Sequence, residues 1–159
     1  MAKIYILCGK IASGKTTYAK ELKKTMTAVI LSHDDLMLKL YDGCLGSNHD
    51  ETVRRISDYF YSLAEELITL DTNVIFDFGY WTKSERLYAK EYFSDKGIDI
   101  EVHYLKTSDS QRLQWLDHRN KSLAGSTSRV YIIENNLREV LDKKFEEPTE
   151  DEVHKIITH

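Results

Sequence analysis

The fold of this chain is decided by residues 9–16, which read Gly9-Lys10-Ile11-Ala12-Ser13-Gly14-Lys15-Thr16. They match G-x-x-x-x-G-K-[ST], the pattern of a phosphate-binding loop. A short apolar run rich in strand formers, Lys3–Cys8, precedes the loop, and the residues after it, Thr16–Lys24, are typical of a helix. Because a strand, a glycine loop and a helix follow one another in that order, the pattern predicts a binding site and not a chance turn.

The loop favours a nucleoside triphosphate for physical reasons. Glycine at positions 9 and 14 allows backbone conformations that turn the loop N–H groups inward, and the following helix adds its positive end. Lys15 can reach the β- and γ-phosphates, and the Thr16 hydroxyl can bind Mg²⁺. No Asn-Lys-x-Asp signature of GTP specificity occurs in the chain, so ATP is the expected nucleotide. The expected contacts are Gly9, Lys10, Ile11, Ala12, Ser13, Gly14, Lys15, Thr16 and Thr17.

The composition narrows the class of protein. The chain has 159 residues, of which 42% are hydrophobic and 30% charged, as expected for one globular domain spanning 1–159. A formal net charge of −4 argues against a protein whose main work is to track nucleic acid. The apolar start is too short for a membrane span and lacks the features of a signal peptide, so we expect a cytoplasmic protein. Cys8 and Cys44 have no metal-ligand spacing, and Cys8 is expected to be a core thiol.

Apolar segments of two kinds alternate along the chain. Near-continuous apolar runs indicate strands of a parallel sheet, and runs with helical spacing indicate amphipathic helices. Thr82 is a plausible N-cap with Glu85 at capping-box distance, and Gly97 follows the same helix. This alternation predicts an α/β domain whose site lies at the carboxyl ends of the strands. The expected strands are 3–8, 28–31, 73–78, 98–105 and 153–158, and the expected helices are 16–24, 36–41, 50–70, 82–96, 109–121 and 131–144.

Acidic residues follow the second and third predicted strands. Asp34 and Asp35 come directly after 28–31, where one carboxylate could accept the proton of an attacking hydroxyl, or could simply cap the next helix. Asp77 ends the third strand, the usual place of the carboxylate that helps to hold Mg²⁺ in phosphate-loop enzymes. A cap or turn residue is the alternative for Asp77. Thr16 and Asp77 are therefore the expected metal elements.

Arginines surround a small polar loop at residues 123–128. Arg112, Arg119 and Arg129 could form a lid that brings positive charge over the phosphates, although each could also belong to a solvated face. Surface charge is the preferred interpretation for Arg54 and Arg55.

Three further residues are candidates by position only. His33 stands beside Asp34, but a single histidine has many structural uses. Tyr80 and Trp81 follow Asp77 and could either stack on a flat acceptor or pack against the lid.

Taken together, these residues resemble the small phosphate-loop kinases of the AAA_33 type, which are related to chloramphenicol phosphotransferase, zeta-toxin kinases, gluconokinase and polynucleotide kinase. The resemblance covers most of the chain. It is carried by Gly9–Thr17, Ser32–Asp35, Val74–Trp81 with Ser84–Arg86, His118–Asn120 and Phe145–Thr149.

The resemblance implies a three-layer phosphate-loop NTPase fold, similar to the NMP kinases, with strand order 2-3-1-4-5 and a small lid at about residues 112–130. It implies transfer of the ATP γ-phosphate to a hydroxyl group. The motifs do not specify the acceptor, and a small-molecule kinase that uses ATP and Mg²⁺ is the first hypothesis. Asp34 then takes the place of the general base, Lys15 that of the phosphate ligand and Arg119 that of the lid cation. By the same resemblance, residues 145–149, with Pro148, lie near the adenine.

The sequence departs from this family in two places. Ile11 and Ala12 stand where proline and glycine are common, and Trp115 stands near the place of a further lid arginine, for which Arg112 or Arg129 could substitute. Two other functions stay open: a 5′-hydroxyl polynucleotide kinase, echoed by Asp34-Asp35 and Ser84–Arg86, and a non-catalytic ATP-binding module. The acceptor pocket is expected between the helices after the second strand and the Tyr80-Trp81 loop, whereas the acceptor's identity and the oligomeric state cannot be deduced.

Overall fold

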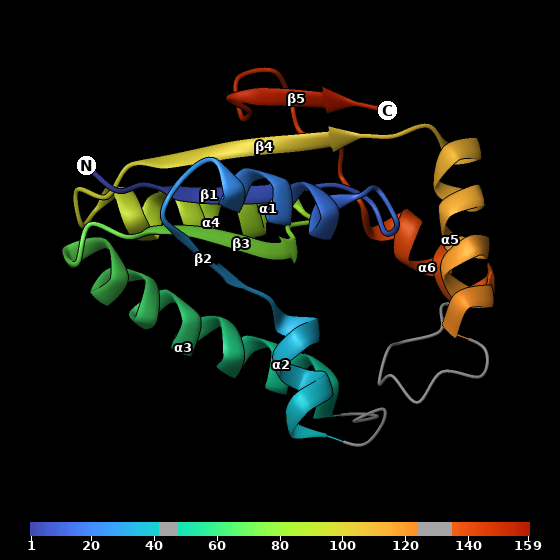
Figure 1. Ribbon diagram of the computed structural model, residues 1–159, viewed down its shortest axis with the longest axis horizontal. Coiled ribbons are helices and arrows are strands. Elements are labelled where there is room, and N and C mark those ends of the chain that lie inside the picture. Colours follow the sequence, from blue (N-terminus) through green and yellow to red (C-terminus); the bar gives the residue numbers. More distant parts are fainter. Residues whose placement is uncertain (42–47, 124–134) are drawn as a thin grey trace.

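A five-stranded parallel sheet runs through the computed structural model, which describes residues 1–41, 48–123 and 135–159 (Figure 1). Every neighbouring pair of strands is parallel, and the order β2-β3-β1-β4-β5 confirms the expected topology. The strands are β1 (Ile4–Cys8), β2 (Ala28–Leu31), β3 (Asn73–Gly79), β4 (Ile100–Lys106) and β5 (Lys155–Thr158).

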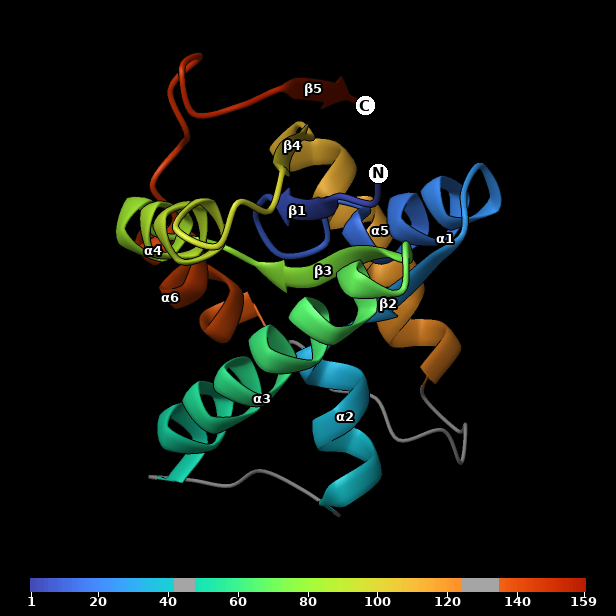
Figure 2. The same ribbon diagram turned by 90° about the vertical axis from the view of Figure 1, so that its left-hand side faces the viewer.

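Helices cover both faces of the sheet and make three layers (Figure 2). α1 (Lys15–Lys24) lies on one face, and α3 (His49–Thr69) and α4 (Lys83–Ser94) lie on the other. Successive strand residues point to opposite faces, so in β3 Phe76 packs under α3 and α4 while Ile75 packs under α1. This two-sided burial explains why the strands are apolar almost throughout.

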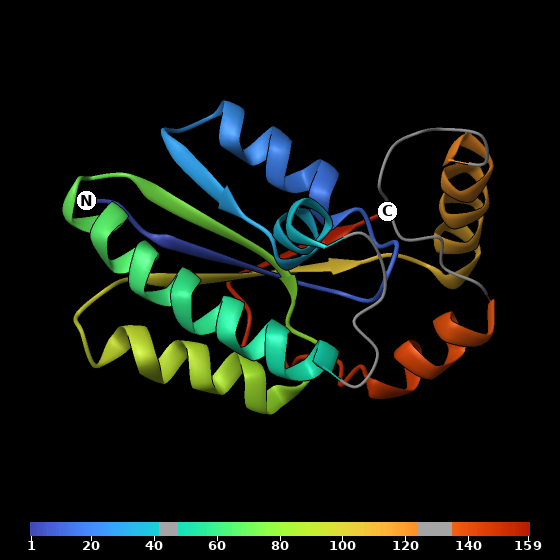
Figure 3. The same cartoon turned by 90° about the horizontal axis from the view of Figure 1, so that it is seen from below.

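The remaining helices stand near the carboxyl ends of the strands. α2 (His33–Leu40) follows β2 directly, and α5 (Asp109–Leu123) and α6 (Asn135–Lys144) lie beyond the ends of β1 and β4 (Figure 3). This edge of the sheet therefore collects the loop at residues 9–14 and the residues that follow β2, β3 and β4.

The boundaries agree with the sequence prediction, with local differences. α2 begins three residues earlier than expected because Ser32 caps it, accepting a hydrogen bond from the Asp35 N–H. α4 has the expected capping box of Thr82 and Glu85. Gly97, just past this helix, has a φ of 68°, as the glycine signal predicted. Cys8 is a buried core thiol, as expected.

Some predicted features fall outside the described residues, namely Cys44, most of the 123–128 loop, Arg129 and the expected first turn of the last helix. Within the three described segments, no helix combines the length and apolar character that crossing a membrane requires.

Candidate active site

The phosphate-binding loop turns sharply between β1 and α1. A Cβ at Gly9 would lie 2.7 Å from Ser13 Oγ and 2.9 Å from the Leu105 carbonyl oxygen, so a side chain has no room there. Gly14 caps α1 with a φ of 90°, and a Cβ on it would approach Trp115. Ala12 adopts a φ of 57°, a left-handed conformation that glycine takes more easily. The loop therefore closes with alanine at that position, at some cost in backbone strain.

The ammonium group of Lys15 lies inside this loop. Lys15 Nζ donates to the carbonyl oxygens of Gly9 at 2.8 Å and Lys10 at 2.7 Å. Burial lowers the pKa of Lys15 to about 8, against the opposing influence of the Asp77 and Asp34 carboxylates. The Lys15 ammonium is thus already positioned in the loop before an anion binds. Because burial disfavours its unbalanced positive charge, binding of an anion there is favoured.

Thr16 and Asp77 meet directly. The Thr16 hydroxyl donates to Asp77 Oδ2 at 2.7 Å. The pairing follows from the alternation of β3, because Asp77 is two residues beyond Ile75 and shares its face, where α1 begins. A hydroxyl and a carboxylate are hard oxygen donors of the kind Mg²⁺ prefers. No cluster of three or more His, Cys, Asp or Glu side chains suited to a metal occurs in the described residues, but Mg²⁺ commonly takes only one or two protein ligands beside phosphates and waters.

The two aspartates after β2 have different surroundings. Since Ser32 caps α2, neither aspartate is needed for that purpose. Asp35 is exposed and pairs with Lys39 at 2.7 Å. Asp34 keeps exposed surface, yet nearby protein removes part of its hydration and, together with the Asp77 carboxylate, raises its pKa. Arg119 and Lys15 act in the opposite direction.

Four predicted site residues therefore share one electrostatic environment. The Asp77 and Asp34 carboxylates raise the pKa of Lys15 against the effect of burial, and Asp77, Lys15 and Arg119 on α5 all act on the pKa of Asp34. These groups come from the starts of α1 and α2, the end of β3 and the middle of α5, so the parallel topology brings together residues far apart in the sequence.

Arg112, one of the two arginines that could have substituted at the further lid position, is engaged in a buried ion pair instead. Its side chain is 1% exposed and binds Asp142 on α6 through two hydrogen bonds of 2.8 and 2.5 Å. The guanidinium is thereby committed to joining α5 to α6. Arg54 and Arg55 pair with acidic neighbours on α3 and are surface charges, as expected.

Tyr80 lies in the core, so its ring is not available for the stacking on an acceptor that was one of its two expected roles. Its side chain is 5% exposed, and its hydroxyl lies 3.1 Å from that of Tyr61. Gly79 and Tyr80 have successive positive φ values of 96° and 46°, which turn the Tyr80 ring back into the core.

His33 has a structural role. Its ring stacks on Phe78 with the ring centroids 3.7 Å apart, and it is hydrogen-bonded to Ser57. Burial lowers the pKa of His33 to about 4.

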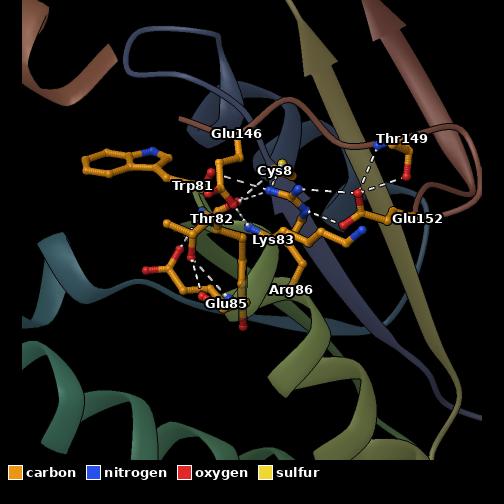
Figure 4. Close-up of polar contacts among 11 residues, drawn as sticks. Cys8, Trp81, Thr82, Lys83, Glu85, Arg86, Glu146, Thr149 and Glu152 are labelled. Atoms are coloured by element: carbon orange, nitrogen blue, oxygen red, sulfur yellow. Dashed lines mark hydrogen bonds and ion pairs between the residues drawn. The ribbon is translucent and has the colours of Figure 1, made fainter. Parts of the chain in front are cut away.

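Arg86 holds the loop after β3 in place (Figure 4). The buried guanidinium donates to the carbonyl oxygens of Tyr80 and Trp81 at 3.1 and 3.4 Å and pairs with Glu152 at 3.0 Å. Glu146 reinforces the same junction, accepting from the Lys83 N–H at 2.6 Å. Arg86 is therefore a structural clamp, and the Ser84–Arg86 motif presents no arginine for nucleic acid.

The segment 145–149 crosses from α6 toward β5. Pro148 is buried, and Glu147 pairs with Lys106 at 2.9 Å and accepts from the Tyr104 hydroxyl. A contact between Pro148 and a nucleotide stays a prediction.

Two aromatic rings beside Gly14 were not predicted to meet there. A Cβ at Gly14 would lie 3.4 Å from Trp115 Cζ3 and 4.0 Å from His159 Nε2, and the two rings pack edge to face with centroids 5.5 Å apart. The sequence held one signal for His159: it follows the last predicted strand, whose carboxyl end must lie at the same edge of the sheet as the phosphate loop.

Solved structures with the same fold include several kinases. The chain is 18% identical to Kti12 from Chaetomium thermophilum in complex with ADP-AlF3 (TM-score 0.71), over 98% of this chain and 88% of that chain. The APS kinase CysC of Mycobacterium tuberculosis, in complex with AMPPNP and APS, is 19% identical (TM-score 0.60), over 99% and 88%. A gluconokinase from Sinorhizobium meliloti 1021 is 14% identical (TM-score 0.64), over 99% and 82%.

These similarities confirm the predicted phosphate-loop NTPase fold. The comparison with curated proteins gave no match. Over residues 4–146 the sequence matches the family model AAA_33, described as an AAA domain, and the chain therefore belongs to that family.

Proposed function

We propose that this protein is an ATP-dependent phosphotransferase that moves the γ-phosphate to a hydroxyl group of a small-molecule acceptor. One observation carries the proposal. The Asp34 carboxylate is not needed as a helix cap, and it shares an electrostatic environment with Lys15, Asp77 and Arg119. A module that only binds nucleotide has no use for a carboxylate beside the terminal phosphate, whereas a kinase needs a base there.

The proposed chemistry assigns one role to each group. Lys15 and the loop N–H groups hold the phosphates of ATP, while Thr16 and Asp77 would hold Mg²⁺, which supplies positive charge to the β- and γ-oxygens when bound. The acceptor oxygen forms a bond to the γ-phosphorus, the bond from that phosphorus to the β–γ bridging oxygen breaks, and ADP leaves. The hydroxyl proton passes to Asp34, whose raised pKa brings its proton affinity closer to that task. Arg119 offsets charge on the transferring group.

A small-molecule acceptor is favoured over a polynucleotide. The formal net charge is −4. Arg86, which belongs to the motif that echoed a polynucleotide kinase, is engaged in the core, and the surface arginines Arg54 and Arg55 pair with acidic partners on α3.

The test is a phosphoryl-transfer screen with MgATP and a panel of hydroxyl compounds, in which formation of the phosphorylated product is measured. Asp34→Asn should lower the transfer rate roughly 10²- to 10⁴-fold while leaving MgATP affinity nearly unchanged. Asp35→Asn is the matched control, because Asp35 is adjacent, exposed and paired with Lys39. Equal activity of the Asp34 and Asp35 variants would refute the assignment. MgATP binding without transfer to any member of a broad panel would favour a binding module.

A further inference from the structure

The Trp115 and His159 rings form an aromatic surface at the mouth of the phosphate loop. Trp115 lies against Gly14, the N-cap of α1, and is 36% exposed. His159 packs on it edge to face, and the His159 N–H donates to the Lys106 carbonyl oxygen at 3.4 Å, which extends the pairing of β5 with β4. One ring therefore comes from α5 and the other follows β5, and both border the turn that would hold the phosphates.

The direction of α5 indicates which end of a nucleotide lies here. Trp115 and Arg119 are four residues apart on this helix, so they share a face about 6 Å apart along its axis. Trp115 contacts Gly14, whereas Arg119 acts on the Asp34 carboxylate. A ligand whose terminal phosphate faces Asp34 and Arg119 and whose other phosphates lie in the loop would extend its remaining part toward Trp115.

We infer that Trp115, steadied by His159, is the surface on which the base of the bound nucleotide stacks. The inference rests on the proposed function, since it assumes a triphosphate in the loop. Trp115 is a partly exposed indole beside a phosphate site, and nucleotide bases stack on the flat face of such a ring. Because every base has a π-face, this stacking depends little on which base is bound. In the other possible role, Trp115 only packs α5 against the loop, and its loss would then affect every phosphate ligand equally.

The experiment compares MgATP with magnesium tripolyphosphate, which has the phosphates without the base. Isothermal titration of the Trp115→Ala protein should show MgATP affinity reduced roughly 5- to 100-fold, as expected for one base stacked on an aromatic ring. Its affinity for magnesium tripolyphosphate should stay within about twofold of the wild type. Trp115→Phe should retain most of the MgATP affinity. Leu113→Ala is the matched control, because Leu113 is on the same helix and 39% exposed, and it should change neither affinity.

Equal losses for the two ligands in Trp115→Ala, or no loss for either, would overturn the inference. If the wild type binds neither MgATP nor magnesium tripolyphosphate, the proposed function is overturned instead. If Trp115→Ala does not fold, the Trp81→Phe protein provides the test. The chain has two tryptophans, so this variant keeps Trp115 as its single fluorescent indole. Its emission should change with MgATP and not with magnesium tripolyphosphate, and the same response to both would refute base stacking.

Discussion

The buried ion pair between Arg112 and Asp142 is expected to be one of the strongest single contributions to stability in this molecule. We predict that Arg112→Met lowers the free energy of unfolding by about 3–4 kcal/mol, since breaking one side of a buried pair is strongly destabilising and leaves Asp142 with Arg138, 3.5 Å away, in place of its two hydrogen bonds to Arg112. The structure supports the lower part of the usual range, because Arg112 is 1% exposed but Asp142 is 18% exposed and keeps some hydration. For a chain of this length, that loss corresponds to a melting temperature about 6–16 °C lower.

The assay for this prediction is urea unfolding followed by circular dichroism, with three comparisons. Lys121→Met removes an ion pair from the surface of the same helix, where both side chains are mostly exposed, and should change stability by less than about 1 kcal/mol. Arg112→Met combined with Asp142→Leu removes both charges and should recover most of the loss. A loss below about 1 kcal/mol in Arg112→Met, or a double variant no more stable than the single one, would refute the reasoning.

The remaining predictions concern the phosphate loop and one helix cap. Nucleotide affinity should fall about tenfold between pH 7 and pH 9. Lys15 has a pKa of about 8 in the free protein, so above that pH it must take up a proton when the nucleotide binds. Calorimetric titrations in buffers of different ionisation enthalpy will measure the proton uptake. pH-independent affinity over this range would contradict it. Ala12→Gly should raise the free energy of unfolding by up to about 1 kcal/mol, since it relieves a φ of 57°; calorimetry showing a destabilised variant would count against strain there. Thr82→Ala should cost about 1 kcal/mol in urea unfolding by removing the capping box of α4, and a neutral result would deny the cap that role.

The strands and helices could be predicted from the sequence because the apolar pattern of each segment, and in α4 the helix cap and the glycine stop, favour the structure that the segment adopts. The apolar runs became parallel strands, helical spacing became α3 and α4, and the Thr82 cap and Gly97 stop lie where they were expected. Strand order followed from the resemblance rather than from periodicity, because alternation fixes the faces of a strand but not its neighbours.

Side-chain partnerships across distant elements could not be predicted in the same way. Nothing in the spacing around Arg112 shows that Asp142, thirty residues later, will neutralise it. The burial of Tyr80 depends on two successive positive φ values, of which only Gly79 has a sequence signal. The contact between Trp115 and His159 needs α5 and the end of β5 placed in space. These three cases explain why the sequence left the roles of Arg112 and Tyr80 open and why the aromatic pair was missed.

The position of β5 at the edge of the sheet links its local unfolding to the nucleotide. Among the described strands β5 pairs only with β4, and most of its side chains are exposed, so it should open more often than the central strands. His159 follows β5 directly, and each opening would withdraw its ring from Trp115. A nucleotide that stacks on Trp115 should therefore slow hydrogen exchange at the β5 amides. The ratio of exchange rates with and without nucleotide would then give the coupling free energy between an edge strand and a binding site.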